Sequence, residues 1–149
     1  MKDRTRARGI ALQALYELDI TNHPVGKVLI ERIADSELDE NLVLFFRSIV
    51  LGVWPIRQEL DNFIAEHAPD WPLDQVAIID RNILRIALWE FAVADDTPLK
   101  VVINEAVELA KTYGSDSAPR FVNGVLGSLA DRQSEITQYL QQIQSQKTD

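Results

Sequence analysis

Three arginines occupy alternate positions at the start of the chain, within the segment MKDRTRAR: Arg4, Arg6 and Arg8. A guanidinium group donates paired hydrogen bonds that match phosphate oxygens. In an extended arm all three side chains would point the same way, whereas on a helix Arg4 and Arg8 share a face that Arg6 does not. Either arrangement predicts weak, salt-sensitive binding to a phosphate backbone, without sequence specificity.

The charge of the chain is unevenly distributed. The net charge is −8, yet residues 1–8 carry four basic side chains and one acidic, while the other 141 residues carry 11 basic and 22 acidic. A basic arm on an acidic body predicts an anionic partner at one end and a different partner elsewhere. The alternative is an ordinary solvated N-terminus.

The sequence lacks the residue patterns that are typical of catalytic or metal-binding sites. There is no Cys, so disulfides, thiolate metal sites and cysteine nucleophiles are excluded. His23 and His67 have no neighbour at metal-ligand spacing, and no Gly-x-Ser-x-Gly motif occurs. Gly124 and Gly127 fall in an apolar helical pattern rather than a phosphate-binding loop. We therefore expect no enzyme activity, no cofactor and no metal.

Apolar residues recur at helical period along nearly the whole chain, which predicts an all-α fold of about seven helices in two packed helical bundles. We expect a single domain, 1–132, with a basic arm at 1–8, helical halves at about 4–68 and 73–132, and a Gln-rich, weakly helical extension at 133–149. Pro55 either kinks or breaks the pattern of 42–66. Asp95 to Pro98 resembles a capped helix start. No apolar run is long enough for a membrane span, so a cytoplasmic location is the simplest expectation.

Four segments resemble the NusB family, the bacterial transcription antitermination factors. They are RARGIALQALYELD at 6–19, DRNILRIALWE at 80–90, KVVINEAVELAKTYG at 100–114 and RFVNGVLGSLA at 120–130. The resemblance implies an all-α fold, no catalysis, and a heterodimer with ribosomal protein NusE. It also implies that this pair binds the single-stranded boxA element of nascent RNA and helps RNA polymerase read through terminators, chiefly in ribosomal RNA operons.

The resemblance also implies site residues. Those matching basic and aromatic positions of the family's RNA surface are Arg4, Arg6, Arg8, Tyr16, Lys111, Arg120 and Phe121. Unpaired RNA is bound by cationic grooves with aromatic or guanidinium stacking platforms, which these residue types supply. Core packing is the alternative for Tyr16 and Phe121. If the N-terminal and C-terminal groups lie side by side, they form one RNA-binding patch.

The partner surface implied by the resemblance contains Asp80, at an acidic family position, and Ser117, where the family often has Asp. Thr5 stands where the arm often carries another basic residue, and Asp3 offsets part of its charge. Two other functions remain open at this point. One is a stand-alone module that binds ribosomal RNA, as in RNA methyltransferase fusions. The other is a protein-interaction module that forms a homodimer.

Overall fold

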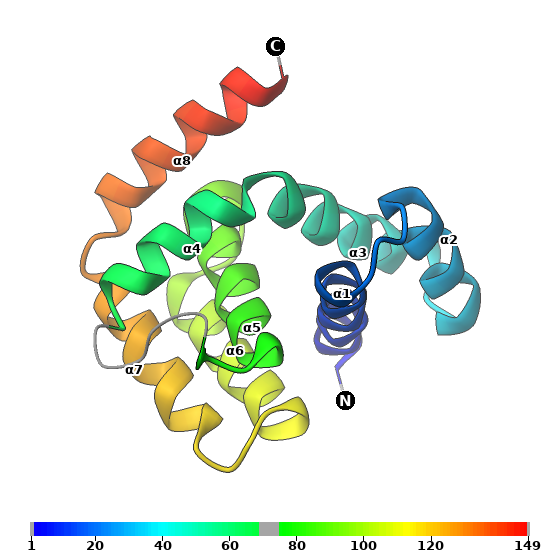
Figure 1. Ribbon diagram of the computed structural model, residues 1–149, viewed down its shortest axis with the longest axis horizontal. Coiled ribbons are helices and arrows are strands. Elements are labelled where there is room, and N and C mark those ends of the chain that lie inside the picture. Colours follow the sequence, from blue (N-terminus) through cyan, green and yellow to red (C-terminus); the bar gives the residue numbers. More distant parts are fainter. Residues whose placement is uncertain (1, 69–74, 149) are drawn as a thin grey trace.

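The computed structural model describes residues 2–68 and 75–148, and all regular structure within them is helical (Figure 1). The eight α-helices of these residues are α1 (Asp3–Ile20), α2 (Val25–Ser36), α3 (Glu40–Val53), α4 (Arg57–Glu66), α5 (Ile78–Trp89), α6 (Leu99–Tyr113), α7 (Ala118–Ala130) and α8 (Gln133–Thr148). The predicted all-α class is confirmed. The expected start of the second helical half, at about 73, lies outside the described residues.

Pro55 breaks the helical pattern that the sequence predicts over 42–66. Residues Trp54–Ile56 form a 3-10 turn, η1, between α3 and α4. A proline lacks the backbone N–H of a helix interior but fits the first turn of a new helical segment. The break lets α4 leave the direction of α3 and pack on α5 (Figure 1).

Helix α5 is the centre of the molecule. It packs against α1, α3, α4, α6 and α7, and every residue from 82 to 90 is buried. In Figure 1, α1 is seen nearly end-on between the α2–α3 hairpin and the layer of α5 and α6. The buried apolar side chains of both halves form one continuous core. The arm at the start of α1 is therefore held against a rigid body.

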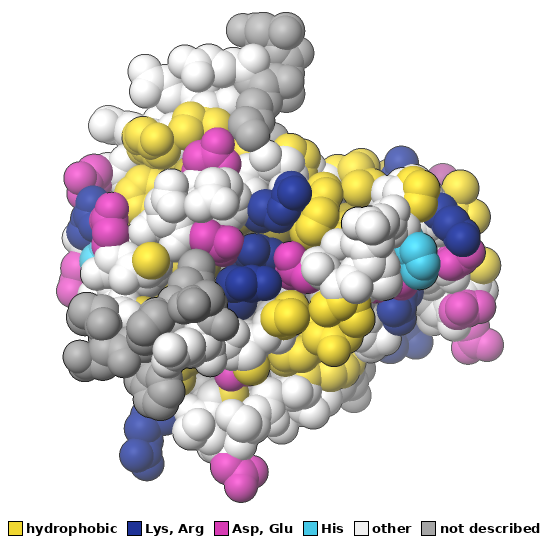
Figure 2. Space-filling model, in the orientation of Figure 1, with side chains coloured by type: hydrophobic (Ala, Val, Ile, Leu, Met, Phe, Trp, Pro, Cys, Tyr) yellow, Lys and Arg dark blue, Asp and Glu magenta, His cyan; other side chains and the backbone are white. Residues whose placement is uncertain are grey.

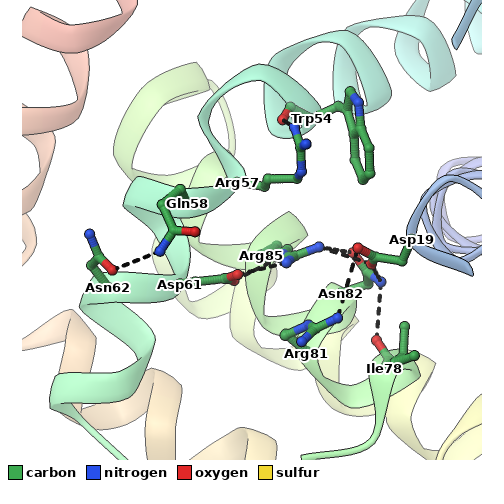
Figure 3. Close-up of polar contacts among 10 residues, drawn as sticks. All are labelled: Asp19, Trp54, Arg57, Gln58, Asp61, Asn62, Ile78, Arg81, Asn82 and Arg85. Carbon is green, nitrogen blue, oxygen red and sulfur yellow. Dashed lines mark hydrogen bonds and ion pairs between the residues drawn. The ribbon is translucent and has the colours of Figure 1, made fainter. Parts of the chain in front are cut away.

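A charged network joins the two halves beside α5 (Figure 3). Arg85 is buried and lies 3.0 Å from Asp19 of α1 and 2.6 Å from Asp61 of α4. Burial opposes its charge, but the two carboxylates raise the pKa of Arg85 above its ordinary value. Asn82 also donates to Asp19, at 2.6 Å. Figure 2 shows Lys and Arg side chains beside acidic ones near the middle of this face, with hydrophobic side chains on either side.

The C-terminal extension is more ordered than its composition suggests. α8 packs on η3, the π-helical turn at Glu90–Ala94, and buries Ile136 and Leu140. Tyr139 meets the Phe63 ring edge to face, with centroids 5.4 Å apart. The prediction of a weakly helical tail was wrong, because few apolar residues suffice when each falls on the face turned to the core.

The start of α6 also differs from expectation. Its first residue follows Pro98, and no side chain caps it. Asp95 instead adopts a left-handed conformation, φ 50°, and ends the π-helical turn. Among the described residues, no helix is long and apolar enough to cross a lipid bilayer.

Candidate nucleic-acid and protein interface

The basic arm is the first two turns of α1 rather than an extended strand. Arg4 and Arg8 therefore share a face, as the helical alternative predicts. Both lie over the ring of Phe45 on α3, with guanidinium carbons 4.2 Å and 5.0 Å from the ring centroid. Arg4 is exposed, whereas Arg8 is only 3% exposed.

Arg8 is committed to a partner inside the protein. Its guanidinium group donates three hydrogen bonds of 2.9–3.1 Å to the carboxylate of Glu90, which is 2% exposed. Burial raises the pKa of Glu90, and the Arg8 guanidinium acts in the opposite direction. A guanidinium that is buried and bound in this way has no free edge for a phosphate. The structure thus gives Arg8 a structural position, unlike the contact to RNA inferred from the resemblance.

Lys2, at the start of the arm, borders a recess between α1 and α6. This recess, of about 460 Å3, is lined by Lys2, Thr5, Asn104, Glu105, Glu108 and Thr112. Thr5 donates to Glu105 at 2.7 Å, and Lys111 pairs with Glu108 at 3.2 Å. Arg4 and Arg6 have no ion pair within the described part of the chain. They are the arm's arginines whose charge remains available.

Tyr16 lies further along α1 and is 37% exposed, so core packing does not account for it. Between the arm and Tyr16, α1 packs closely on the last turn of α6. Gln13 donates to the hydroxyl of Tyr113 at 3.3 Å. A Cβ at Gly9 would lie 2.8 Å from that same hydroxyl, so a larger residue there would require the Tyr113 side chain to shift.

A second opening lies at the other side of that last turn of α6. It is a cleft of about 440 Å3 whose lining includes Asp80, Ser117, Arg120 and Phe121. Asp80 is 6% exposed, its Oδ1 atom has no hydrogen-bond partner among the described residues, and burial raises its pKa. Ser117 and Arg120 are exposed, and Phe121 is half-buried. The cleft thus combines both predicted partner residues with two of the predicted RNA residues.

Gly114 is the point where the helices around this cleft come closest. A Cβ there would lie 2.6 Å from that of Ala118 and 2.9 Å from Oδ1 of Asp80. Neighbouring Tyr113 contacts α1, as described above. The turn Tyr113–Gly114 therefore separates the recess beside the arm from the cleft around Asp80, with one opening on each side of it. The recess and the cleft share no lining residue, and of the predicted site residues Asp80, Ser117, Arg120 and Phe121 line the cleft.

Two residues that matter here were not assigned a role from the sequence. Phe45 falls on the apolar stripe of the pattern at 42–66, which indicates a core position rather than a role in the site. Glu90 is a single acid inside the apolar run IALWEFAVA, a pattern typical of a buried carboxylate with a basic partner. The partner itself, 82 positions away, has no signal in the sequence.

The fold and the two openings together define a class of all-helical protein. A protein of this class presents a helical arm with arginine side chains and an exposed aromatic ring, and it has a cleft that contains a buried carboxylate. Among the described residues, no three His, Asp or Glu side chains lie close enough together to hold a metal ion.

The chain belongs to the NusB family, whose family model matches residues 5–131. It is 49% identical over 134 residues to a transcription antitermination protein NusB of Roseiflexus castenholzii, covering 89% of this chain and 94% of that protein. It is 43% identical over 129 residues to the protein of that name in Bacillus subtilis, covering 87% and 95%. The predicted family is confirmed, and its boundary leaves α8 outside the family match.

Solved structures agree with this assignment. NusB of T. maritima superposes with a TM-score of 0.79 at 27% identity, covering 93% of this chain and 98% of that one. A chain from a crystal structure of the antitermination factors NusB and NusE in complex with double-stranded RNA superposes with a TM-score of 0.77 at 26% identity, covering 86% and 96%.

Proposed function

We propose that this protein is an RNA-binding subunit of transcription antitermination that acts as a heterodimer with ribosomal protein NusE. In this role it binds the single-stranded boxA element of nascent RNA and reaches the RNA polymerase elongation complex through its partners. Its task is to bind and position macromolecules, chiefly on ribosomal RNA operons. The family membership supports this role, as does the complex of related NusB and NusE proteins with RNA.

The observation that carries the proposal is the pair of openings on either side of Tyr113–Gly114. We assign the RNA backbone to the arm, where the unneutralised guanidinium groups of Arg4 and Arg6 attract phosphates. Lys111 adds a weaker charge, because Glu108 already compensates it. Tyr16 supplies an exposed ring for an unpaired base.

We assign the protein partner to the cleft around Asp80. Its buried carboxylate oxygen lacks a donor, so a partner side chain that donates a hydrogen bond would satisfy it. Ser117 adds a hydroxyl at the rim. Arg120 and Phe121 line the same cleft, and we assign them to RNA that passes the boundary between the two proteins.

The direct test is filter binding of a boxA-type single-stranded RNA at several salt concentrations, with and without NusE. The double variant Arg4→Ala/Arg6→Ala should bind more weakly and flatten the salt slope by about 1.4, because each phosphate contact on single-stranded RNA contributes about 0.7. Arg47→Ala, which removes an exposed arginine of α3 outside the proposed site, is the matched control.

Three results would contradict this function. They are absence of RNA binding both with and without NusE, binding that ignores the boxA sequence when NusE is present, and an unchanged salt slope in the double variant. Light scattering of the free protein and of the mixture with NusE separates the heterodimer from the alternative of a homodimer that ignores both partners.

A further inference from the structure

The guanidinium groups of two arginines lie over the ring of Phe45, and one of them is buried whereas the other is exposed. Arg8 lies 5.0 Å from its centroid and is buried against Glu90. Arg4, one helical turn earlier, lies 4.2 Å from the same centroid and is exposed. An aromatic face attracts a cation electrostatically, so the ring restrains the position of the Arg4 side chain.

Arg4 differs from the other basic side chains of the arm in being both restrained and free to bind. Within the described residues it has no ion pair, whereas Arg8 of the arm and Lys111 of α6 each have an acidic partner. Exposed arginines usually lose considerable rotamer freedom when they bind a ligand, and a side chain already held in place loses less. A guanidinium plane can also stack on a nucleobase.

We propose that Phe45 is a positioning residue that holds Arg4 as a stacking platform for one unpaired base of the bound RNA. The ring supports one side of the guanidinium group, and the base stacks on the side exposed to solvent. The charge of Arg4 contributes to phosphate attraction with or without the ring. Phe45 adds the geometry that makes the contact sensitive to the base. This inference rests on the proposed RNA-binding function and adds a residue that the resemblance does not supply.

Another arginine that lies over an aromatic ring, away from the arm, serves as an internal control. Arg57 lies 3.7 Å from the centroid of the Trp54 ring, and it also donates to the Trp54 carbonyl at 2.6 Å (Figure 3). This pair sits at the opposite end of α3 from Phe45, beside the network of Arg85. Its guanidinium is half-buried and fixed by the backbone. Removing the Trp54 ring therefore deletes a similar interaction outside the arm.

The experiment measures binding of a boxA-type RNA and of versions that lack one base at a time but keep the backbone. For the wild type, deleting the stacked base should weaken binding. Phe45→Leu should bind intact RNA roughly two- to fivefold more weakly, which corresponds to loss of an exposed cation–π contact. Its salt slope should stay unchanged, because no charge is removed, and its sensitivity to that base should disappear. Phe45→Tyr keeps the ring and should restore both.

Arg4→Lys tests the same proposal without any change in α3. It keeps the charge and removes the guanidinium plane, so the salt slope should persist while the base sensitivity is lost. Trp54→Leu should retain wild-type binding and base sensitivity. Thermal unfolding of each variant identifies any that fails to fold, and if Phe45→Leu fails, Arg4→Lys decides.

The outcomes are distinguishable. A wild type that binds no RNA overturns both the function and the platform. A wild type that binds RNA but shows the same base sensitivity as Phe45→Leu and Arg4→Lys overturns the platform alone. Equal losses in Phe45→Leu and Trp54→Leu also overturn it, because the effect would then not be specific to the arm.

Discussion

Two buried carboxylates, Glu90 and Asp80, lie near opposite ends of the segment Ile78–Ala94 and are treated differently by the fold. Glu90 faces the arm and receives three hydrogen bonds from Arg8. Asp80 borders the cleft, and its Oδ1 atom receives none. Both are less than 10% exposed, and burial raises the pKa of each. The two environments thus differ in whether a basic partner is present.

The difference in hydrogen bonding distinguishes Glu90, which has a structural partner, from Asp80, which borders an open cleft. A buried charge without a partner is costly, so folds normally supply one. Arg8 supplies it for Glu90, which fixes the first turns of α1 on the core. At Asp80 the open cleft leaves room for a donor from another molecule. Glu90 therefore contributes to the packing of α1 on the core, whereas we propose that Asp80 contributes to recognition of a partner.

The largest expected effect is at the paired site. Arg8→Ala should lower the free energy of unfolding by about 3–5 kcal/mol, because it leaves Glu90 buried without its partner. Urea denaturation measures the change. Replacing the pair together, with Arg8→Met and Glu90→Leu, should recover most of the loss, since apolar side chains of similar size need no partner. An Arg8→Ala protein as stable as the wild type would contradict a stabilising role for the Arg8–Glu90 pair.

The same pair shows where prediction from sequence succeeds and where it stops. Helical periodicity placed most elements correctly, because every helix turns an apolar stripe to a shared core. For the arm it left an extended segment and a helix open, and the structure shows the helix, with Arg4 and Arg8 on one face. What it could not provide was the partner of Arg8, since contacts between α1 and Glu90 depend on how the helices pack. The resemblance supplied residue types at given positions, but it did not show that Arg8 pairs with Glu90 inside the protein.

The grouping of the site residues likewise depends on packing. Arg120 and Phe121 are far in sequence from Asp80, yet they line one cleft with it because α7 and α5 pack side by side. The sequence offered no way to choose between this grouping and one with the arm. Similarly, α8 buries Ile136 and Leu140 although its composition is polar, because burial depends on which face is apolar.

At Asp80 we expect a smaller change in the free energy of unfolding, of opposite sign to that of Arg8→Ala. The folded protein holds the proton of Asp80 more tightly than the unfolded chain does, because burial raises its pKa. Stability contributed by this group therefore falls as the pH rises through the interval between the ordinary and raised values, and it stays lower above that interval. Asp80→Asn removes the charge and should raise stability near pH 7 by about 1 kcal/mol.

Denaturation at several pH values tests this prediction. The advantage of Asp80→Asn should shrink as the pH falls below the ordinary range of an aspartate, where the wild-type carboxyl is neutral in both states. An advantage that grows toward acid pH would show that Asp80 is stabilised as an anion. In a pull-down, the same variant should bind NusE less well despite its greater stability, because a neutral amide attracts a basic donor less strongly.

The smallest change in the free energy of unfolding is expected at an exposed ion pair that does not line the cleft. Lys111 and Glu108 are one turn apart on α6, and their side chains are 59% and 58% exposed. Lys111→Ala should change the free energy of unfolding by less than about 0.5 kcal/mol, because water screens such pairs. The more informative variant is Glu108→Gln, which removes the carboxylate that compensates the charge of Lys111 beside the arm. That variant should bind RNA more tightly than the wild type and steepen the salt slope, whereas an unchanged slope would place Lys111 outside the path of the RNA.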